Sequence, residues 1–140
     1  MTTPQVSVAV LVSCTTVLAC GPTPPSLELV RADGAVARAF DGVERATTPE
    51  ARAQGLVGHA GLGPSDAMVL EYPVVDTACI TNAHVTFPIV AVYVAQDGTI
   101  VATEPLAAHA TSTPCHDAVR WVVEIDEGGT RGATRVVFRP

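Results

Sequence analysis

Apolar and polar residues alternate over much of the chain, and this is the pattern of half-buried β-strands. Turn-forming residues separate the alternating segments. The pattern predicts strands over residues 27–31, 35–46, 68–72, 85–94, 99–103, 119–126 and 135–139. Within the second of these, Asp41-Gly42 is a candidate bulge or turn. Pro73 is expected to end the third strand, and Pro88 to confine the start of the fourth to an edge or a bulge.

One short helix interrupts this series. Thr47 or Thr48 is a suitable N-cap, Pro49 fits the first turn, and Glu50 suits the positive end of the helix dipole. The helix should end near Gly58. Turns rather than crossover helices join the strands, so the predicted fold is mainly β (α+β): a small antiparallel β-sheet or barrel-like domain of about seven strands with one short helix.

The N-terminal segment predicts export. Residues 6–20 carry no charge and fall short of the roughly 20 residues that a transmembrane helix needs. They suit the apolar region of a secretory signal, which ends in Val17-Leu18-Ala19-Cys20, the pattern of a lipoprotein cleavage site. We expect a signal peptide over 1–19, a lipidated Cys20 with a Pro-rich tether over 20–26, and a single β-rich domain over 27–140.

The residues before this apolar run include no Lys or Arg, whereas a positive charge is usual there. Two alternatives therefore stay open: another form of export or anchoring, and a buried strand of a cytosolic protein. The lipoprotein interpretation places the protein in the cell envelope, in the outer membrane facing the periplasm or at the cell surface.

The four cysteines divide between these parts of the chain. Cys14 would leave with the signal peptide and Cys20 would be acylated, so Cys79 and Cys115 remain. In an oxidising compartment such a pair is a disulfide candidate, which would contribute about 4 kcal/mol in the chain-entropy description. The alternative is two separate thiols, of which one is reactive.

Charge excludes one class of partner. The 14 acidic residues outnumber the 8 basic ones, giving a net charge of −6 at pH 7. All the basic residues are arginines and they are scattered along the chain. Nucleic-acid binding needs clustered positive charge, so we expect no nucleic-acid partner.

Five segments in order resemble the domain-of-unknown-function 192 family, whose members are small and often exported. The matching segments are Thr48–Gly58, Ala67–Leu70, Phe87–Gly98, Trp121–Gly128 and Arg135–Phe138. The resemblance covers about two-thirds of the chain and implies a fold and an exported habitat, but no reaction. His59, His84 and Val90 stand where the family has Arg, Asn and Asp, so a polar trio of the family is replaced here.

Few residues of the sequence are candidates for catalysis, metal binding or ligand binding. Cys115-His116-Asp117 are adjacent in sequence, and adjacent side chains diverge, so they do not predict a catalytic triad. Metal-ligand spacing is missing from the four histidines and two remaining cysteines, so we expect no metal and no cofactor. His59 and His84 are weak candidates for a binding site. Carboxylates such as Glu124 are expected to be solvated.

We therefore expect a membrane-tethered envelope lipoprotein that acts as a binding or accessory module for an envelope protein or a small ligand, with no catalytic residue. The alternative is an envelope hydrolase or thiol-dependent enzyme that uses Cys115 or Cys79 with His84. The enzyme predicts a free cysteine with a low pKa, whereas the binding module predicts an inert disulfide.

Overall fold

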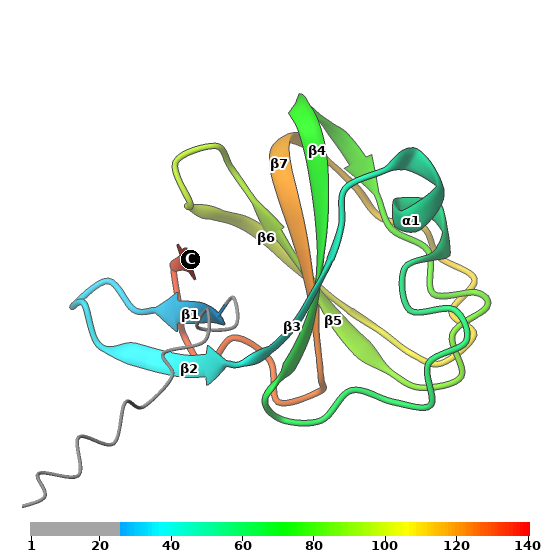
Figure 1. Cartoon of the computed structure of the whole chain (residues 1–140), viewed down its shortest axis with the longest axis horizontal. Coiled ribbons are helices and arrows are strands. Elements are labelled where there is room, and N and C mark those ends of the chain that lie inside the picture. Colours follow the sequence, from blue (N-terminus) through cyan, green and yellow to red (C-terminus); the bar gives the residue numbers. More distant parts are fainter. Residues whose placement is uncertain (1–25) are drawn as a thin grey trace, which may run out of the picture.

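Eight strands and one short helix form the described part of the chain, residues 26–140 of a computed structural model (Figure 1). The elements are β1 (Ser26–Val30), β2 (Val36–Phe40), β3 (Gly42–Ala46), α1 (Pro49–Gln54), β4 (Asp66–Cys79), β5 (Ile89–Val94), β6 (Ile100–Leu106), β7 (Cys115–Ile125) and β8 (Arg135–Arg139). The predicted class, mainly β with one helix, is confirmed.

The strands form two sheets rather than a closed barrel. A three-stranded sheet has the order β2-β1-β8, and a five-stranded sheet has the order β3-β4-β7-β5-β6. All pairs are antiparallel except β3 with β4, which run parallel because α1 and a loop carry the chain back to the same end. The purely antiparallel arrangement expected from the sequence is therefore wrong at this edge.

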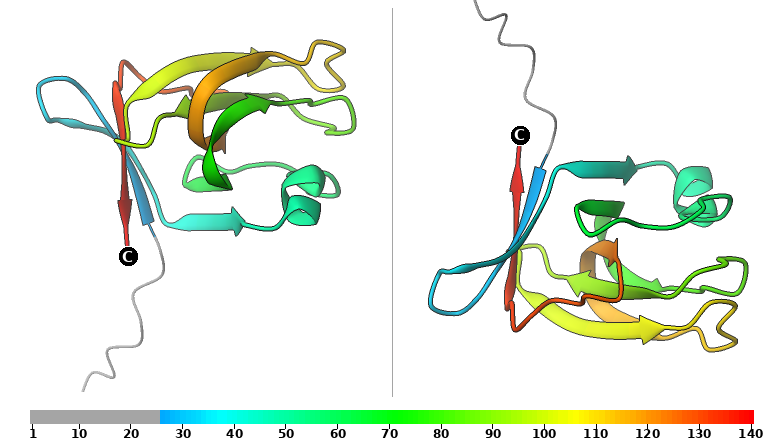
Figure 2. Two further views of the ribbon diagram at one scale, coloured as in Figure 1. Left: turned by 90° about the horizontal axis from the view of Figure 1, so that it is seen from above. Right: turned by 90° about the horizontal axis from the view of Figure 1, so that it is seen from below.

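The five-stranded sheet is buried on both faces. One face packs against the three-stranded sheet, and the opposite face is covered by α1 and the loops that follow it (Figures 1 and 2). Alternate residues of β4 show the division, since Val69 belongs to the cluster between the sheets and Met68 and Leu70 belong to the cluster under α1. We call these the sheet-facing core and the helix-facing core.

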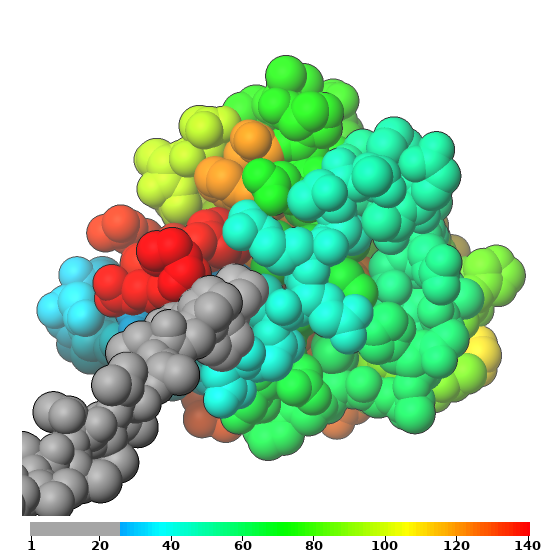
Figure 3. Space-filling model, in the orientation of Figure 1, coloured from blue at the N-terminus to red at the C-terminus, as the bar shows by residue number. Residues whose placement is uncertain are grey.

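The two sheets are joined at their margins. The space-filling view shows the C-terminal strand lying beside β1 on the surface (Figure 3). Arg38 of β2 is 6% exposed and donates hydrogen bonds to the carbonyl oxygens of Gly129 and Pro64 at 3.0 and 2.8 Å. Its guanidinium also pairs with Asp126 at 2.6 Å, so this arginine ties β2 to the turn after β7.

Helix α1 begins where the sequence predicts but is shorter than expected. The side chain of Thr48 accepts a hydrogen bond from the backbone N–H of Ala51 at 3.1 Å, and Pro49 occupies the first turn. The helix ends at Gln54 rather than near Gly58. Gly55 has φ +46° and turns the chain, placing the residues after it over the sheet.

Residues 35–46 divide into two strands, β2 and β3, at Asp41-Gly42, the position that the sequence pattern indicated as a bulge or turn. At Asp41 the chain leaves the three-stranded sheet, and the backbone N–H groups of Asp41 and Gly42 both donate to the Ser65 carbonyl oxygen at 3.2 and 3.0 Å. A Cβ on Gly42 would collide with the carboxylate of Asp66, so a larger residue at this crossing would displace that side chain.

Pro73 does not end its strand. β4 continues to Cys79, and its ladder with β7 is interrupted between Glu71 and Asp76, so no partner needs the N–H that proline lacks. The expected strand over 85–94 begins only at Ile89. The strand expected over 99–103 extends to Leu106, and the strand expected over 119–126 begins already at Cys115.

Candidate functional site

A cleft beside α1 combines a buried acid with a basic and an aromatic residue. It has a volume of about 160 Å³ and is open at the surface. Its walls come from α1, from β4, from β7 and from the loop between β4 and β5. The lining residues that matter below are Arg52, Ala53, Leu56, Leu70, Tyr72, Cys79, Ile80, His84, Val85 and Glu124. We call this hollow the α1 cleft.

Glu124 is the unusual residue of the α1 cleft. It stands on β7 opposite Met68 of β4 and Ala91 of β5, on the helix-facing side of the sheet. Only 4% of its surface is exposed, and its Oε2 atom has no hydrogen-bond partner in the described structure. The sequence led us to expect a solvated carboxylate, and this expectation is wrong because strand register places the side chain in a core.

Burial determines the protonation of this acid. Transfer of a carboxylate out of water disfavours its charged form, and the pKa of Glu124 is raised to about 7. No ion pair of residues 26–140 involves Glu124, so nothing in this part of the chain offsets the loss of water. Burial therefore favours the protonated form of this carboxyl group at pH values where an exposed glutamate is fully ionised.

Arg52 and Tyr72 supply the other polar groups of the cleft. Arg52 Nη1 donates to the carbonyl oxygens of Thr47 and Glu71, both at 2.9 Å, which fixes the guanidinium. The guanidinium carbon lies 5.1 Å from the centre of the Tyr72 ring. Burial, together with the charges of Glu124 and Asp76, raises the pKa of the Tyr72 hydroxyl, while the Arg52 charge opposes this effect.

A disulfide bond closes one side of the α1 cleft. Cys79 and Cys115 are opposite residues of β4 and β7, and their sulfur atoms are bonded to each other. The bond agrees with the prediction from the cysteine count. Because it holds both cysteines of residues 26–140, the thiol-dependent alternative has no free nucleophile there, although Cys79 and His84 both line the cleft.

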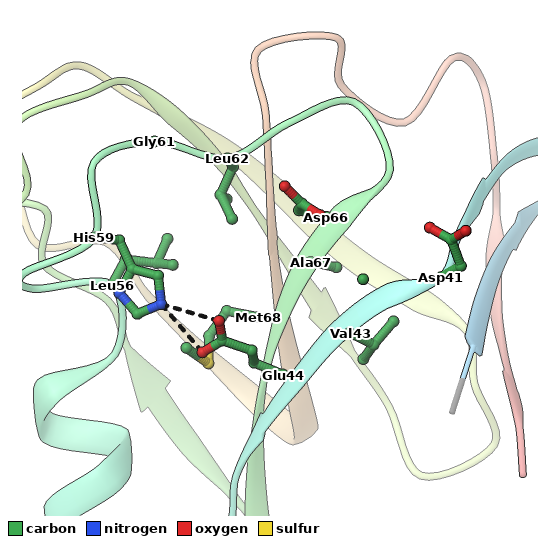
Figure 4. Close-up of a pocket in the computed structure, with 11 residues that line it drawn as sticks. Asp41, Val43, Glu44, Leu56, His59, Gly61, Leu62, Asp66, Ala67 and Met68 are labelled. Carbon is green, nitrogen blue, oxygen red and sulfur yellow. Dashed lines mark hydrogen bonds and ion pairs between the residues drawn. The ribbon is translucent and has the colours of Figure 1, made fainter. Parts of the chain in front are cut away.

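His59 lies in a different hollow, the groove drawn in Figure 4. This groove has a volume of about 350 Å³ and lies between β3 and the loop after α1. His59 Nε2 makes hydrogen bonds of 3.1 and 3.2 Å to the two carboxylate oxygens of Glu44. Asp66 faces the same groove and accepts a hydrogen bond from the N–H of Gly63 at 2.9 Å. The structure thus places the two candidate histidines, His59 and His84, in separate hollows.

The adjacent residues Cys115, His116 and Asp117 have separate partners, as divergent neighbours should. Cys115 is in the disulfide bond, His116 Nε2 lies 2.8 Å from Glu104 Oε1, and Asp117 accepts a 2.6 Å hydrogen bond from the Thr77 hydroxyl. His116 also stacks edge-on against Tyr93, with ring centres 4.5 Å apart. Each group has a structural partner, and none of them faces the α1 cleft.

Asn82 is a buried polar residue that the sequence analysis did not select. It is fully buried in the loop between β4 and β5, and its Nδ2 donates to the carbonyl oxygens of Phe87 and Ala107 at 3.1 and 2.9 Å. These bonds fix the loop that carries His84 and Val85 to the cleft. A single asparagine in a polar stretch gives no sequence signal for such a role.

Several expectations fall outside these observations. Cys20 and the signal segment lie outside the described residues, so lipidation stays a prediction. Among residues 26–140, no cluster of three or more His, Cys, Asp or Glu side chains could hold a metal ion. In the same part of the chain, no helix has the length and apolar character to cross a membrane.

Fold and cleft together define a class: a small two-sheet β domain with an uncompensated carboxyl group in an open cleft. The chain belongs to the DUF192 family, described as uncharacterized ACR, and the match covers residues 29–134. No match was found among curated proteins.

Two solved structures have a similar fold. One is a protein described as a candidate transcription regulator from Sinorhizobium meliloti, with a TM-score of 0.74 and 22% identity over 81% of this chain and 92% of that one. The other is a protein of unknown function from Novosphingobium aromaticivorans, with a TM-score of 0.70 and 18% identity over 80% of this chain and 83% of that one. At these identities the similarity concerns the fold alone.

Proposed function

We propose that this protein is a membrane-tethered binding module of the bacterial cell envelope, attached through a lipidated Cys20, which binds a small ligand in the α1 cleft. The observation that carries the proposal is the carboxyl group of Glu124, which lines the cleft, is only 4% exposed and makes no ion pair within residues 26–140. A buried polar atom without a partner destabilises the fold, and a ligand that donates a hydrogen bond would remove this cost.

The size of the α1 cleft sets the scale of the ligand. Sites for drug-sized molecules typically occupy roughly 300–1,000 Å³. The α1 cleft, at about 160 Å³, suits a molecule well below that size. Three of its walls are held by defined interactions: the anchored Arg52, the disulfide bond at Cys79, and the loop fixed by Asn82. A preformed cleft of this kind favours binding because little ordering is required.

The tether has its own test, the intact mass of the protein extracted from native membranes. The proposal expects a chain that begins at Cys20 and carries acyl groups, with two alkylatable thiols that appear only after reduction. An unlipidated chain, or a thiol that alkylates rapidly without reduction, would contradict the tethered module.

Binding in the cleft is tested by NMR on the full-length protein in detergent micelles, with cationic, anionic, neutral and zwitterionic fragments. The proposal expects at least one fragment to shift the amide signals of Gly55, Tyr72 and Glu124 in a saturable way. Ala53→Trp, which fills the mouth of the cleft from an exposed position, should abolish these shifts. Ala60→Trp, exposed and outside the cleft, should not. If no fragment perturbs the cleft, the proposal is wrong.

A further inference from the structure

The α1 cleft contains one acidic and one basic group that are not paired with each other. Glu124 has no ion pair in the described structure, and Arg52 makes its hydrogen bonds to backbone carbonyl oxygens through Nη1 alone. A guanidinium has five N–H donors, so Nε and Nη2 of Arg52 keep theirs for another acceptor. Both side chains line the same 160 Å³ hollow.

The two charges together restrict the ligand more than either does alone. A simple amine would be attracted by the Glu124 carboxylate and repelled by the Arg52 guanidinium. A simple carboxylate would be attracted by Arg52 and repelled by Glu124. A molecule with both charges gains a charge-assisted hydrogen bond at each end, and such bonds are roughly twice as strong as neutral ones. The charge pattern therefore selects against either charge in isolation.

The uncharged residues that line the cleft indicate the character of the uncharged part of the ligand. Besides the charged groups, the lining includes the aliphatic side chains of Leu56, Leu70, Ile80 and Val85. An aliphatic side chain of a few carbon atoms would bury its surface there. The small volume of the cleft excludes a long peptide from complete enclosure.

We propose that the α1 cleft binds a free α-amino acid with a small aliphatic side chain, its ammonium group on Glu124 and its carboxylate on Arg52. This assignment rests on the proposed binding function and specifies the ligand class. The ammonium group would donate to the carboxylate of Glu124, which lines the cleft and makes no ion pair within residues 26–140. Arg52, already fixed by Thr47 and Glu71, would bind the carboxylate without having to order its own side chain.

Binding should depend on pH through Glu124. The other titratable or charged groups that line the cleft are Arg52 on α1, Tyr72 on β4 and His84 in the loop before β5. An ammonium ion binds the ionised carboxylate, and the pKa of Glu124 is raised to about 7 by burial. Affinity should therefore rise about tenfold between about pH 6 and pH 8, with release of a proton on binding below neutral pH. Glu124→Gln should abolish this rise, whereas a contribution from His84 would persist in the variant.

The test compares three probes that share an isobutyl skeleton by NMR titration of the full-length protein. They are L-valine, isobutylamine, which lacks the carboxylate, and isovalerate, which lacks the amine. Valine should shift the signals of Gly55, Tyr72, Ile80 and Glu124, and each analogue should bind at least about tenfold more weakly. Glu124→Gln and Arg52→Gln should each weaken valine by a similar factor, and Arg52→Lys should weaken it less. If a variant fails to fold, the analogue series decides without it.

The outcomes distinguish failure of the amino-acid assignment from failure of the proposed binding function. If isobutylamine binds as well as valine, or if valine does not bind while another fragment occupies the cleft, the amino-acid assignment is overturned and the binding module stands. If neither valine nor any fragment of any charge class perturbs the cleft, both proposals fail.

Discussion

The two faces of the five-stranded sheet are built for different purposes. The sheet-facing core is built from apolar side chains, of which the largest are Phe40, Leu27 and Leu29. The buried charge beside it, that of Arg38, is paired with Asp126 at 2.6 Å. The helix-facing side buries Glu124 and Asn82, is closed by a disulfide bond, and opens into the α1 cleft. The comparison indicates that one face supplies stability, which allows the other to keep polar groups that destabilise the fold.

Truncation in the sheet-facing core should give the largest loss of stability. Phe40→Ala removes a ring that is 1% exposed between the two sheets, and we expect the free energy of unfolding to fall by about 3–5 kcal/mol. Urea unfolding measures the change. Val36→Ala, on the same strand but 50% exposed, is the matched control and should cost less than about 0.5 kcal/mol. Equal effects of the two substitutions would contradict the assignment of the core.

Removal of the disulfide bond should lower stability mainly on the helix-facing side of the sheet. The double substitution Cys79→Ala with Cys115→Ala should lower the free energy of unfolding by about 2–4 kcal/mol, mainly because the unfolded chain gains freedom. Hydrogen exchange should accelerate at Ile80, whose N–H donates to the Pro114 carbonyl oxygen at 3.1 Å beside the bond. Exchange at Val123 in the sheet-facing core should change only as much as global stability does. Faster exchange at Val123 than the change in global stability explains would contradict the assignment of the disulfide bond to the helix-facing side alone.

The buried acid should make stability depend on pH. The pKa of Glu124 is about 7 when folded, against an ordinary value of 4.5, so the unfolded chain loses this proton first. The resulting stabilisation is complete below about pH 4.5 and is lost as the pH rises to about 7, a change of about 3 kcal/mol. Glu124→Gln should remove this dependence and should stabilise the protein at about pH 8. Thermal melts across the pH range measure both effects.

Glu44→Gln is the control for that prediction, and it has the smallest expected effect. The Glu44 side chain is 62% exposed, and its pairing with His59 at 3.1 Å is open to solvent. The substitution should change the free energy of unfolding by less than about 1 kcal/mol, as is usual for surface pairs. A loss as large as that in the core would show that the His59 groove matters to folding.

Much of the fold could be predicted from the sequence because local signals agree with the final structure there. Alternation located β1, β7 and β8 to within a few residues, and Thr48-Pro49 located the start of α1. The failures have one cause, which is tertiary context. Pro73 is compatible with β4 only because the β7 ladder is interrupted beside it. The parallel pairing of β3 with β4 depends on the path of α1 and its loop between them.

The site was less accessible to prediction. The cysteine count correctly indicated the Cys79–Cys115 bond, and His84 does line a cleft. Glu124 was not selected, because alternation along β7 assigns its side chain to one face of the sheet without saying whether water or a core lies there. Only the position of α1 and the loop before β5 makes that face a core.

NMR titration of the Glu124 side-chain carboxyl carbon tests most directly the proposal that this buried acid binds a ligand. We expect an apparent pKa near 7 in the free protein, in line with its burial, and a lower pKa when L-valine is added, because an ammonium ion stabilises the charged form. A pKa close to 4.5 in the free protein, unchanged by valine, would contradict both the burial of the acid and its proposed role.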